Sequence, residues 1–249
     1  MPRILAKEEV VRFHEFGYLG IEGIFSQREV KEMSDAIDRI QKIALSQEGE
    51  FMHNGSKFYV IETSNGSKRI EHVNWCGAIE PLLMKYSRDK RIMPLVSELL
   101  GSKEANHLIN QIHFKMPNDG MEFPFHQDSK HRRFGTSHWK DVNGKGSYVN
   151  VILAIDEMNL ENSPLLVSEN PKKHIGEISS EEQKRHLKIA KPVLLNPGDV
   201  LALGPYVIHG SLGNFSNKPR RVLINGFAYP GANSRRFGIP NAGELIRLT

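Results

Sequence analysis

The chain has 249 residues, 39% of them hydrophobic and 25% charged, which is the balance of an ordinary soluble globular protein. A formal net charge of +4 permits an anionic ligand but is too small to predict nucleic-acid binding, and no apolar run approaches the length of a membrane span. The single cysteine, Cys76, excludes an internal disulfide, and the first residues lack the apolar core of a signal peptide, so we expect a cytoplasmic protein with no membrane or nucleic-acid partner.

Helical signals dominate the first hundred residues. A short helix over 6–16 is predicted to end at Gly17, because glycine readily adopts the left-handed conformation that closes helices. Ser26 and Glu29 have the spacing of a capping box, and apolar residues recur behind them at helical intervals as far as Ala44. This pattern predicts a second, amphipathic helix.

The rest of this segment is expected to contain a β pair and another helix. Residues 57–74 favour two short strands joined by a turn at Asn65-Gly66. Asp89 is expected to cap a helix that ends at Gly101, with Pro94 early enough in it to be tolerated.

From residue 101 onward the pattern is typical of short strands. In 107–116 two faces separate, with Leu108, Ile112 and Phe114 on one and Gln111, His113 and Lys115 on the other. Further strands are expected at 147–155, 164–168, 192–195, 199–203, 206–212 and 220–229, with a turn at 196–199 and a helix at 180–190.

This order of elements predicts an α+β, mainly β fold, because helices come first and many short strands follow. We expect one domain over residues 1–249. Its core, over 101–249, is predicted to be a double-stranded β-helix (jelly-roll), and residues 1–100 are predicted to form an α-helical N-terminal flank.

The chemistry is predicted to centre on His126 and Asp128, which are alternate residues of an extended segment and can therefore converge on one point. His209, at the edge of another apolar, strand-like run, can supply a third ligand. Two imidazoles and one carboxylate form the facial triad, which holds Fe(II) and leaves positions open for substrate and oxygen. The alternative interpretation is a packed histidine and a turn aspartate.

The same residues carry a family resemblance. Phe-Pro-Phe-His-Gln-Asp at 123–128, His-Gly-Ser-Leu-Gly-Asn at 209–214 and Pro219-Arg220 resemble the phytanoyl-CoA dioxygenase family, and so does the N-terminal segment 17–26. That family comprises non-haem iron oxygenases that use 2-oxoglutarate and O2. Where many members carry a Pro-Gly-Ser-His-Lys loop, this chain differs over 168–174, so no substrate contact is carried over from that loop.

The resemblance implies two co-substrate residues. Arg220 follows His209 at the spacing of the arginine that holds the far carboxylate of 2-oxoglutarate in the family, and Ser211 matches an assisting hydroxyl. A guanidinium suits this role because it can bind a carboxylate through two parallel hydrogen bonds. On a strand Arg220 and Arg221 must face opposite ways, and we expect Arg220 in the pocket. The alternative leaves both arginines solvated on an edge strand.

Gln111, His113 and Asn150 are polar residues on otherwise apolar strands, and burying them is costly unless something binds them. The resemblance places His113 in a strand that helps to bind the co-substrate. A co-substrate pocket and ordinary polarity at a barrel edge explain these three residues equally well.

A basic cluster follows the predicted iron ligand Asp128. Lys130, Arg132 and Arg133, with Trp139 nearby, are expected either to border the substrate mouth and attract an anion or to form a solvated loop. The two interpretations remain open at the level of sequence.

Together these signals predict an Fe(II)/2-oxoglutarate-dependent dioxygenase. We expect it to use O2 to hydroxylate an unactivated C–H of a small, anionic molecule such as a phosphate, phosphonate, carboxylate or CoA ester, with release of succinate and carbon dioxide. The alternatives are a non-catalytic jelly-roll protein that binds a metal or anion, and an oxygenase of this class that catalyses desaturation or another oxidative step. The sequence does not predict the oligomeric state.

Overall fold

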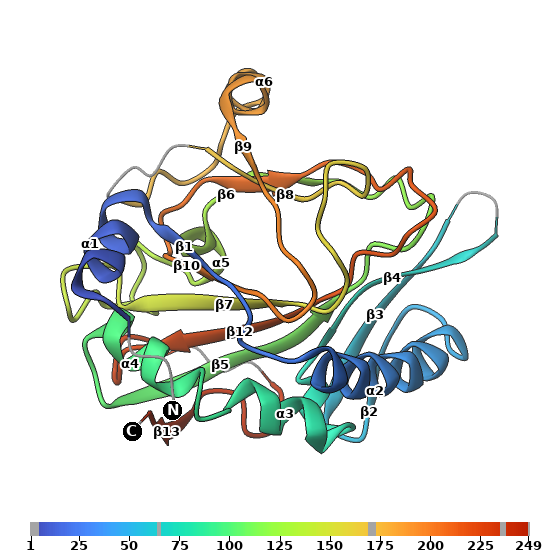
Figure 1. Cartoon of the computed structure of the whole chain (residues 1–249), viewed down its shortest axis with the longest axis horizontal. Coiled ribbons are helices and arrows are strands. Elements are labelled where there is room, and N and C mark those ends of the chain that lie inside the picture. The colour runs from blue at the N-terminus through green and yellow to red at the C-terminus, as the bar shows by residue number, and fades with distance from the viewer. Residues whose placement is uncertain (1–4, 64–65, 169–172, 235–237, 249) are drawn as a thin grey trace.

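Two β-sheets face each other in the computed structural model (Figure 1), which describes residues 5–63, 66–168, 173–234 and 238–248. The major sheet contains β1 (Tyr18–Ile21), β2 (Glu50–His53), β3 (Ser56–Glu62), β4 (Lys68–Asn74), β5 (Glu104–His113), β7 (Tyr148–Ala154), β10 (Val200–Leu203), β12 (Val222–Ala228) and β13 (Glu244–Arg247). The minor sheet contains β6 (Phe123–His126), β8 (Leu165–Val167), β9 (Lys191–Val193) and β11 (His209–Ser211).

The strand order is that of a jelly-roll. In the described part of the chain the major sheet runs β1-β10-β7-β12-β5-β4-β3-β2, with β13 also beside β5, and the minor sheet runs β6-β11-β8-β9. Neighbouring strands are antiparallel throughout. The predicted double-stranded β-helix core is therefore confirmed.

The two N-terminal helices, α1 (Lys7–Phe16) and α2 (Gln27–Leu45), form as predicted. Gly17 ends α1 with a φ of 81°, and its N–H donates to the Phe13 carbonyl. At the start of α2, Ser26 Oγ accepts a hydrogen bond from the Glu29 N–H, while the Glu29 carboxylate accepts one from the Ser26 N–H. Both helix ends are thus set by local sequence.

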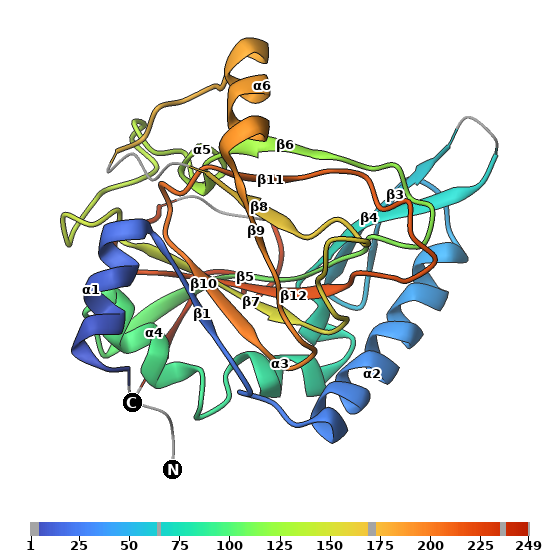
Figure 2. The same cartoon turned by 45° about the horizontal axis from the view of Figure 1, so that its top comes forward.

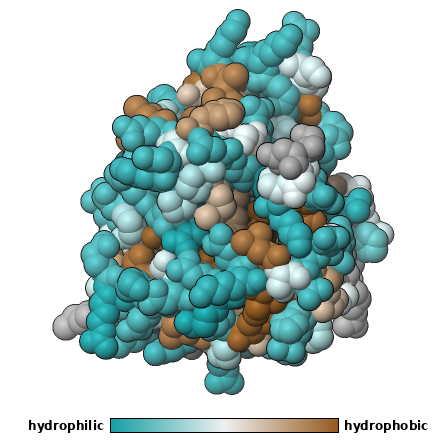
Figure 3. All heavy atoms as spheres, turned by 90° about the vertical axis from the view of Figure 1, so that its right-hand side faces the viewer, coloured by the Kyte–Doolittle hydropathy of each residue, from teal (hydrophilic) through white to brown (hydrophobic). Residues whose placement is uncertain are grey.

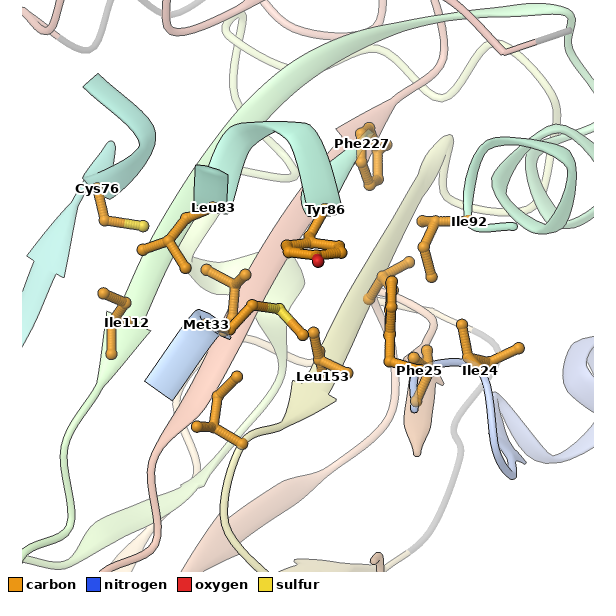
Figure 4. Packing of buried hydrophobic residues seen from close by; sticks show 14 of the residues in the cluster. Ile24, Phe25, Met33, Cys76, Leu83, Tyr86, Ile92, Ile112, Leu153 and Phe227 are labelled. Carbon is orange, nitrogen blue, oxygen red and sulfur yellow. The ribbon is translucent and has the colours of Figure 1, made fainter. Parts of the chain in front are cut away.

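A layer of helices covers the outer face of the major sheet (Figures 1 and 2). It consists of α2, α3 (Pro81–Ser87) and α4 (Met93–Leu100), while α1 lies beside β1. Figure 4 shows Met33 of α2 and Leu83 of α3 packed in one cluster with Ile112, Leu153 and Phe227 of the sheet. These side chains are almost completely buried. Each contributes about 1.5–3 kcal/mol to folding by leaving water, which is what fixes the helices on the sheet.

The first hundred residues supply strands as well as helices. β1 pairs with β10 and β4 pairs with β5, so strands from the expected flank extend both edges of the major sheet. The boundary expected at residue 100 therefore does not separate a helical layer from a sheet. A 3-10 turn, η1 (Cys76–Ala78), follows β4. The predicted turn at Asn65-Gly66 lies partly outside the described residues.

Some predicted boundaries were wrong. α4 begins at Met93 instead of at Asp89, whose carboxylate accepts hydrogen bonds from the backbone and guanidinium of Arg91. Leu108 does not share a face with Ile112. A bulge lies where Gly226 pairs with Ile109 and the next residue of β12 pairs with His107, so Leu108 turns toward the inside of the sandwich.

In the second half, the predicted strands and helix are confirmed with shorter bounds. The run 206–212 contains only the three residues of β11 as a strand. α6 (Ser180–Ile189) forms as predicted, although its cap is Ser179 and not Ser180. A short helix that was not predicted, α5 (Asp128–His131), begins at the expected iron ligand.

The space between the sheets is apolar at its two ends and polar in the middle. One cluster gathers residues such as Ile152, Leu201 and Val207, and the other gathers Trp139 and Tyr148 with their neighbours. Within the described residues, no helix is long and apolar enough to cross a membrane. The face drawn in Figure 3 is mainly hydrophilic, and its hydrophobic side chains form small, separate groups.

Candidate metal and co-substrate site

A cavity of about 900 Å³ lies between the two sheets. His126 and His209 of the minor sheet line it from one side, and His113, Asn150 and Ile224 of the major sheet line it from the other. This cavity is where the polar residues predicted from sequence come together.

The three predicted metal ligands converge because of strand pairing. His126, the last residue of β6, is the direct cross-strand partner of His209, the first residue of β11. Asp128 follows two residues later, at the start of α5. Its Oδ1 lies 4.0 Å from His126 Nε2 and 3.9 Å from His209 Nε2, and one ligand atom from each residue fits within 4.8 Å of the others.

Hydrogen bonds orient each of these ligands. His126 Nδ1 donates to the Pro124 carbonyl at 2.7 Å, and His209 Nδ1 donates to the Val207 carbonyl at 3.0 Å. A carbonyl can only accept, so in both rings the Nε2 lone pair is left free for a metal. Asn150 Nδ2 donates to Asp128 Oδ2 at 2.9 Å and holds the carboxylate in place.

The protonation states also suit a cation. Burial, followed by the neighbouring His209, holds the pKa of His126 well below its usual range, so the imidazole is neutral near pH 7. Burial by itself acts to raise the pKa of Asp128, but the basic groups around it, His209 and Arg132 among them, together outweigh it, and the net shift is downward. Two imidazole nitrogens and a carboxylate are the donor set of the Fe(II) facial triad, and the site fits that metal.

Arg220 lies in the same cavity, and no ion pair to its guanidinium occurs among the described residues. It is 5% exposed, and its Nε–H has no hydrogen-bond partner among the described residues. Burial lowers the pKa of Arg220 to about 10, so the guanidinium is still charged near pH 7. Ser211 Oγ, also in the cavity lining, is buried and equally without a partner. The buried guanidinium of Arg220 and the hydroxyl of Ser211 thus have unused hydrogen-bonding atoms, which fit the carboxylate of 2-oxoglutarate.

The neighbouring Arg221 has the opposite environment. Its guanidinium bonds Asp156 at 2.8 Å, Asp38 at 2.6 Å and Ser34 at 2.9 Å, on the outer side of the major sheet against α2. The two arginines therefore face opposite ways, and it is Arg220 that lines the cavity.

The weaker co-substrate candidates also line the cavity. Gln111 Nε2 donates to His113 Nε2 at 2.7 Å, and the His113 ring stacks on Phe123 with 5.2 Å between ring centroids. Asn150 lines the cavity as well, but its amide is already engaged with Asp128. The contact with Asp128 makes Asn150 a residue that positions a ligand, which its sequence context did not indicate.

The basic cluster after Asp128 divides into two groups. Lys130 and Arg132 line the cavity, and Lys130 forms an ion pair of 2.7 Å with Glu177. The Arg132 Nε–H is buried, with no hydrogen-bond partner among the described residues. Arg133 is exposed and is not among the described lining residues.

Trp139 does not reach the cavity either, which corrects its expected place at the substrate mouth. Its indole is 8% exposed, stacks on Phe134 at 4.6 Å between ring centroids, lies edge-on to Tyr148 and donates to the Gly146 carbonyl. Burial in this aromatic cluster explains why the side chain is held away from the mouth.

Sequence reasoning missed a wall of the cavity formed by β3 and β4. Lys57 and Tyr59 of β3, with His72 and Asn74 of β4, line it. The signal was the alternation of these polar residues with apolar ones, which predicts a strand with one polar face. That this face borders the cavity depends on the pairing of β4 with β5, which sequence alone does not indicate.

Comparisons with known proteins agree with this geometry. The chain is 23% identical over 242 residues to L-proline trans-4-hydroxylase from Streptomyces griseoviridis, covering 86% of this chain and 83% of that protein. It is 23% identical over 240 residues to ectoine dioxygenase from Bordetella bronchiseptica, covering 87% and 73%. The crystal structure of EctD from S. alaskensis with 2-oxoglutarate and 5-hydroxyectoine has the same fold, with a TM-score of 0.74 at 20% identity, covering 94% of this chain and 80% of that one.

The family itself follows from a match to the model of phytanoyl-CoA dioxygenase (PhyH), which covers residues 13–222. The match includes the two segments that carry His126, Asp128 and His209, and also Arg220. The chain belongs to the phytanoyl-CoA dioxygenase family.

Proposed function

We propose that this Fe(II)/2-oxoglutarate-dependent dioxygenase holds iron with His126, Asp128 and His209 and hydroxylates a small substrate that carries an anionic group. The observation that carries the proposal is that Arg220 and Arg132 both line the cavity that contains the three ligands, and that the Nε–H of each is buried with no hydrogen-bond partner among the described residues. A buried N–H without a partner is costly, and two charged side chains that each carry one suit two separate anions. We assign Arg220 to 2-oxoglutarate and Arg132 to the substrate.

With iron and 2-oxoglutarate bound, such a site supplies the oxidising chemistry that turns 2-oxoglutarate and O2 into succinate and carbon dioxide while a substrate C–H is hydroxylated. The residues of this chain orient the reactants. The Pro124 and Val207 carbonyls fix the two imidazoles, and Asn150 fixes the carboxylate of Asp128. Apolar side chains on the major sheet, such as Ile224, keep water away from the reacting atoms.

A small substrate is supported by the names of the relatives, which refer to L-proline and to ectoine. The anionic group is supported by Arg132, because Lys130 is already neutralised by Glu177. A reducing, cytoplasmic location is part of the same proposal, and the buried free thiol of Cys76 supports it.

The first experiment measures succinate. Purified protein with Fe(II) and 2-oxoglutarate should form succinate only when O2 is present, faster with substrate than without it, and the His126→Ala variant should form none. A protein that binds Fe(II) and 2-oxoglutarate but forms no succinate under any condition would instead be a binding protein.

The second experiment tests the charge of the substrate. Small carboxylates and phosphates are screened for stimulation of succinate formation, and the best of them is tested on two matched variants. Arg132→Gln should raise its KM about tenfold or more, because a charge-assisted hydrogen bond is lost, while Arg133→Gln, outside the described cavity lining, should leave it unchanged. Equal effects, or a preference for uncharged compounds, would contradict the assignment of Arg132.

A further inference from the structure

The inner face of β3 and β4 is a polar surface that the reaction as described does not use. We call it the β3–β4 wall and define it as Lys57 and Tyr59 of β3 with Glu71, His72 and Asn74 of β4, all of which line the cavity. On the opposite side of these strands, Phe58 and Val60 of β3 and Ile70 and Val73 of β4 are apolar and buried in the main hydrophobic core. Because these strands place their polar side chains on the cavity side, the wall can bind a ligand or water.

Strand pairing places this wall in line with the rest of the cavity floor. Lys57 pairs with Asn74, Asn74 with Gln111, Gln111 with Ile224, and Ile224 with Ile152, and all five line the cavity. The row is polar over β3, β4 and β5 and apolar over β12 and β7. A substrate lying along it therefore meets polar groups at one end and hydrocarbon at the other.

A second row runs beside the first and is uncharged. Tyr59, His72 and His113 are cross-strand partners, with ring centroids 4.1 Å apart for the first pair and 5.5 Å apart for the second. Burial lowers the pKa of His72 to about 4, so its imidazole carries no charge near pH 7. The row can hydrogen-bond to a ligand without repelling one that is positively charged.

The charges of the β3–β4 wall and its unused hydrogen-bond acceptors favour a ligand that donates hydrogen bonds. Asn74 Oδ1 is buried, and no described residue donates to it. Glu71 is the extra residue of a bulge in β4, because Tyr59 pairs with His72 and Val60 pairs with Ile70. A bulge changes the direction of a side chain, and Glu71 lines the cavity. No ion pair of Glu71 occurs among the described residues.

The one cation of the wall is already neutralised. Lys57 Nζ lies 2.8 Å from Glu50 Oε2 and 4.5 Å from the centroid of the Tyr59 ring. With Lys57 paired, the wall presents an unpaired carboxylate and a buried carbonyl oxygen. Both are acceptors, and leaving a buried acceptor open is costly.

We propose that Asn74 and Glu71 bind an amine or ammonium group of the substrate, at the end of the molecule opposite the anionic group held by Arg132. The substrate is then a small ω-amino acid or a comparable zwitterion, with the hydrocarbon between its charges lying over the apolar part of the cavity floor. This assignment rests on the proposed function, because it takes the anion site at Arg132 from it. It makes the β3–β4 wall the surface that selects the substrate.

The test compares acids with and without nitrogen. The probes are 4-aminobutanoate with butanoate, 5-aminopentanoate with pentanoate, and 6-aminohexanoate with hexanoate. In each pair the carboxylate is kept and the nitrogen is removed. Binding is measured by anaerobic calorimetry with the Fe(II)- and 2-oxoglutarate-loaded enzyme, and turnover by succinate formation. We expect at least one amino acid to bind about tenfold or more tightly than its nitrogen-free partner.

Variants of the wall then separate recognition from folding. Asn74→Leu and Glu71→Gln should each remove most of this preference, whereas Asn74→Asp, which keeps an acceptor, should retain it. Glu62→Gln, at the exposed end of β3 and outside the described cavity lining, is the control and should change nothing. Succinate formation without any probe should be the same in Glu62→Gln as in the unsubstituted enzyme, and anaerobic titration of each variant with Fe(II) and 2-oxoglutarate measures metal and co-substrate binding separately.

The outcomes are distinct. If nitrogen-free acids bind as well as the amino acids, if none of the amino acids binds, or if Asn74→Leu and Glu71→Gln keep the preference, the assignment of the β3–β4 wall is wrong. If the unsubstituted enzyme forms no succinate from 2-oxoglutarate and O2, it is the proposed function that fails.

Discussion

Arg220 and Arg221 are adjacent in sequence, yet the buried Nε–H of Arg220 has no hydrogen-bond partner in the described part of the chain, whereas the Arg221 guanidinium bonds Asp156 and Asp38. Arg220→Lys keeps the charge but removes the planar fork, so 2-oxoglutarate affinity should fall about ten- to over a hundredfold. Arg221→Lys should leave this affinity nearly unchanged and lower the free energy of unfolding instead, because it breaks the contacts with Asp156 and Asp38. Anaerobic titration with 2-oxoglutarate and urea unfolding distinguish the two, and equal losses of affinity would show that the strand faces are misassigned.

Asn150 allows a second test, because a role in positioning Asp128 predicts a loss of Fe(II) affinity, whereas a role in co-substrate binding predicts a loss of 2-oxoglutarate affinity. If it positions Asp128 through the 2.9 Å hydrogen bond, Asn150→Leu should weaken Fe(II) binding about ten- to a hundredfold, the usual effect of losing a partner of a metal ligand. Fe(II) affinity is measured by anaerobic titration in the absence of 2-oxoglutarate. Normal Fe(II) affinity with weakened 2-oxoglutarate binding would return Asn150 to the co-substrate role expected from sequence.

Among individual residues, those whose chemistry is tied to a short sequence motif could be predicted from the sequence. His126, Asp128, His209 and Arg220 could be selected because donor type and spacing are visible in the chain, and the structure brings all four into one cavity. Asn74 could not be selected in this way. Its place depends on the pairing of β4 with β5, a contact between strands that are far apart in sequence.

At the scale of elements, β6 carries a metal ligand although it lies at the edge of the minor sheet. Its free edge is covered by α6: Gln183 Oε1 accepts from the Phe125 N–H, and Gln183 Nε2 donates to the Phe125 carbonyl, both at 2.7 Å. The side chain thus replaces a neighbouring strand for one residue. This contact joins α6 to the segment that ends in His126.

Gln183→Ala should therefore loosen β6. Two partly buried hydrogen bonds are lost, and we expect a decrease of about 1–3 kcal/mol in the free energy of unfolding, with faster amide exchange at Phe125 and His126 and weaker Fe(II) binding. Lys188→Ala, an exposed position on the same helix, is the matched control. Unchanged exchange in β6 would mean that β11 alone holds the strand.

Elements with local signals were predicted well, and those set by pairing were not. Gly17 and the Ser26–Glu29 capping box fix helix ends through neighbours in sequence, so both ends were predicted. The bulge at Leu108 and the short length of β11 depend on the partner strands, and no pattern within either segment reveals them.

Over the whole molecule, stability depends on keeping the helical layer attached to the sheet. Arg91 contributes to this from the turn before α4. Its guanidinium bonds Glu29 of α2 at 2.7 Å, Asp89 at 2.7 Å and the Ile24 carbonyl at 3.0 Å, and it lies 4.5 Å from the centroid of the Phe25 ring. One side chain thus ties α2 to the segments on both sides of it.

The Glu29–Arg91 pair makes this attachment sensitive to acid. The hydrogen bond from Arg91 is the main reason that the pKa of Glu29 falls from 4.5 to about 2. A carboxylate with a lowered pKa stabilises the fold fully above its unfolded value and loses that contribution as the pH falls through its folded value. Glu29→Gln should therefore be less stable than the unsubstituted protein at pH 7, with a difference that shrinks from pH 4.5 downward and is nearly gone at pH 2.

Urea unfolding of the metal-free protein at pH 7, 4.5 and 3 measures this difference. Glutamine at this position can still accept the hydrogen bond from Ser26, so the substitution removes the charge and keeps the helix cap. Glu98→Gln, an exposed change on α4, is the control and should show a small difference that does not depend on pH. If the Glu29→Gln difference is equally constant with pH, the ion pair with Arg91 does not stabilise the fold, and α2 is held on the sheet by its apolar face alone.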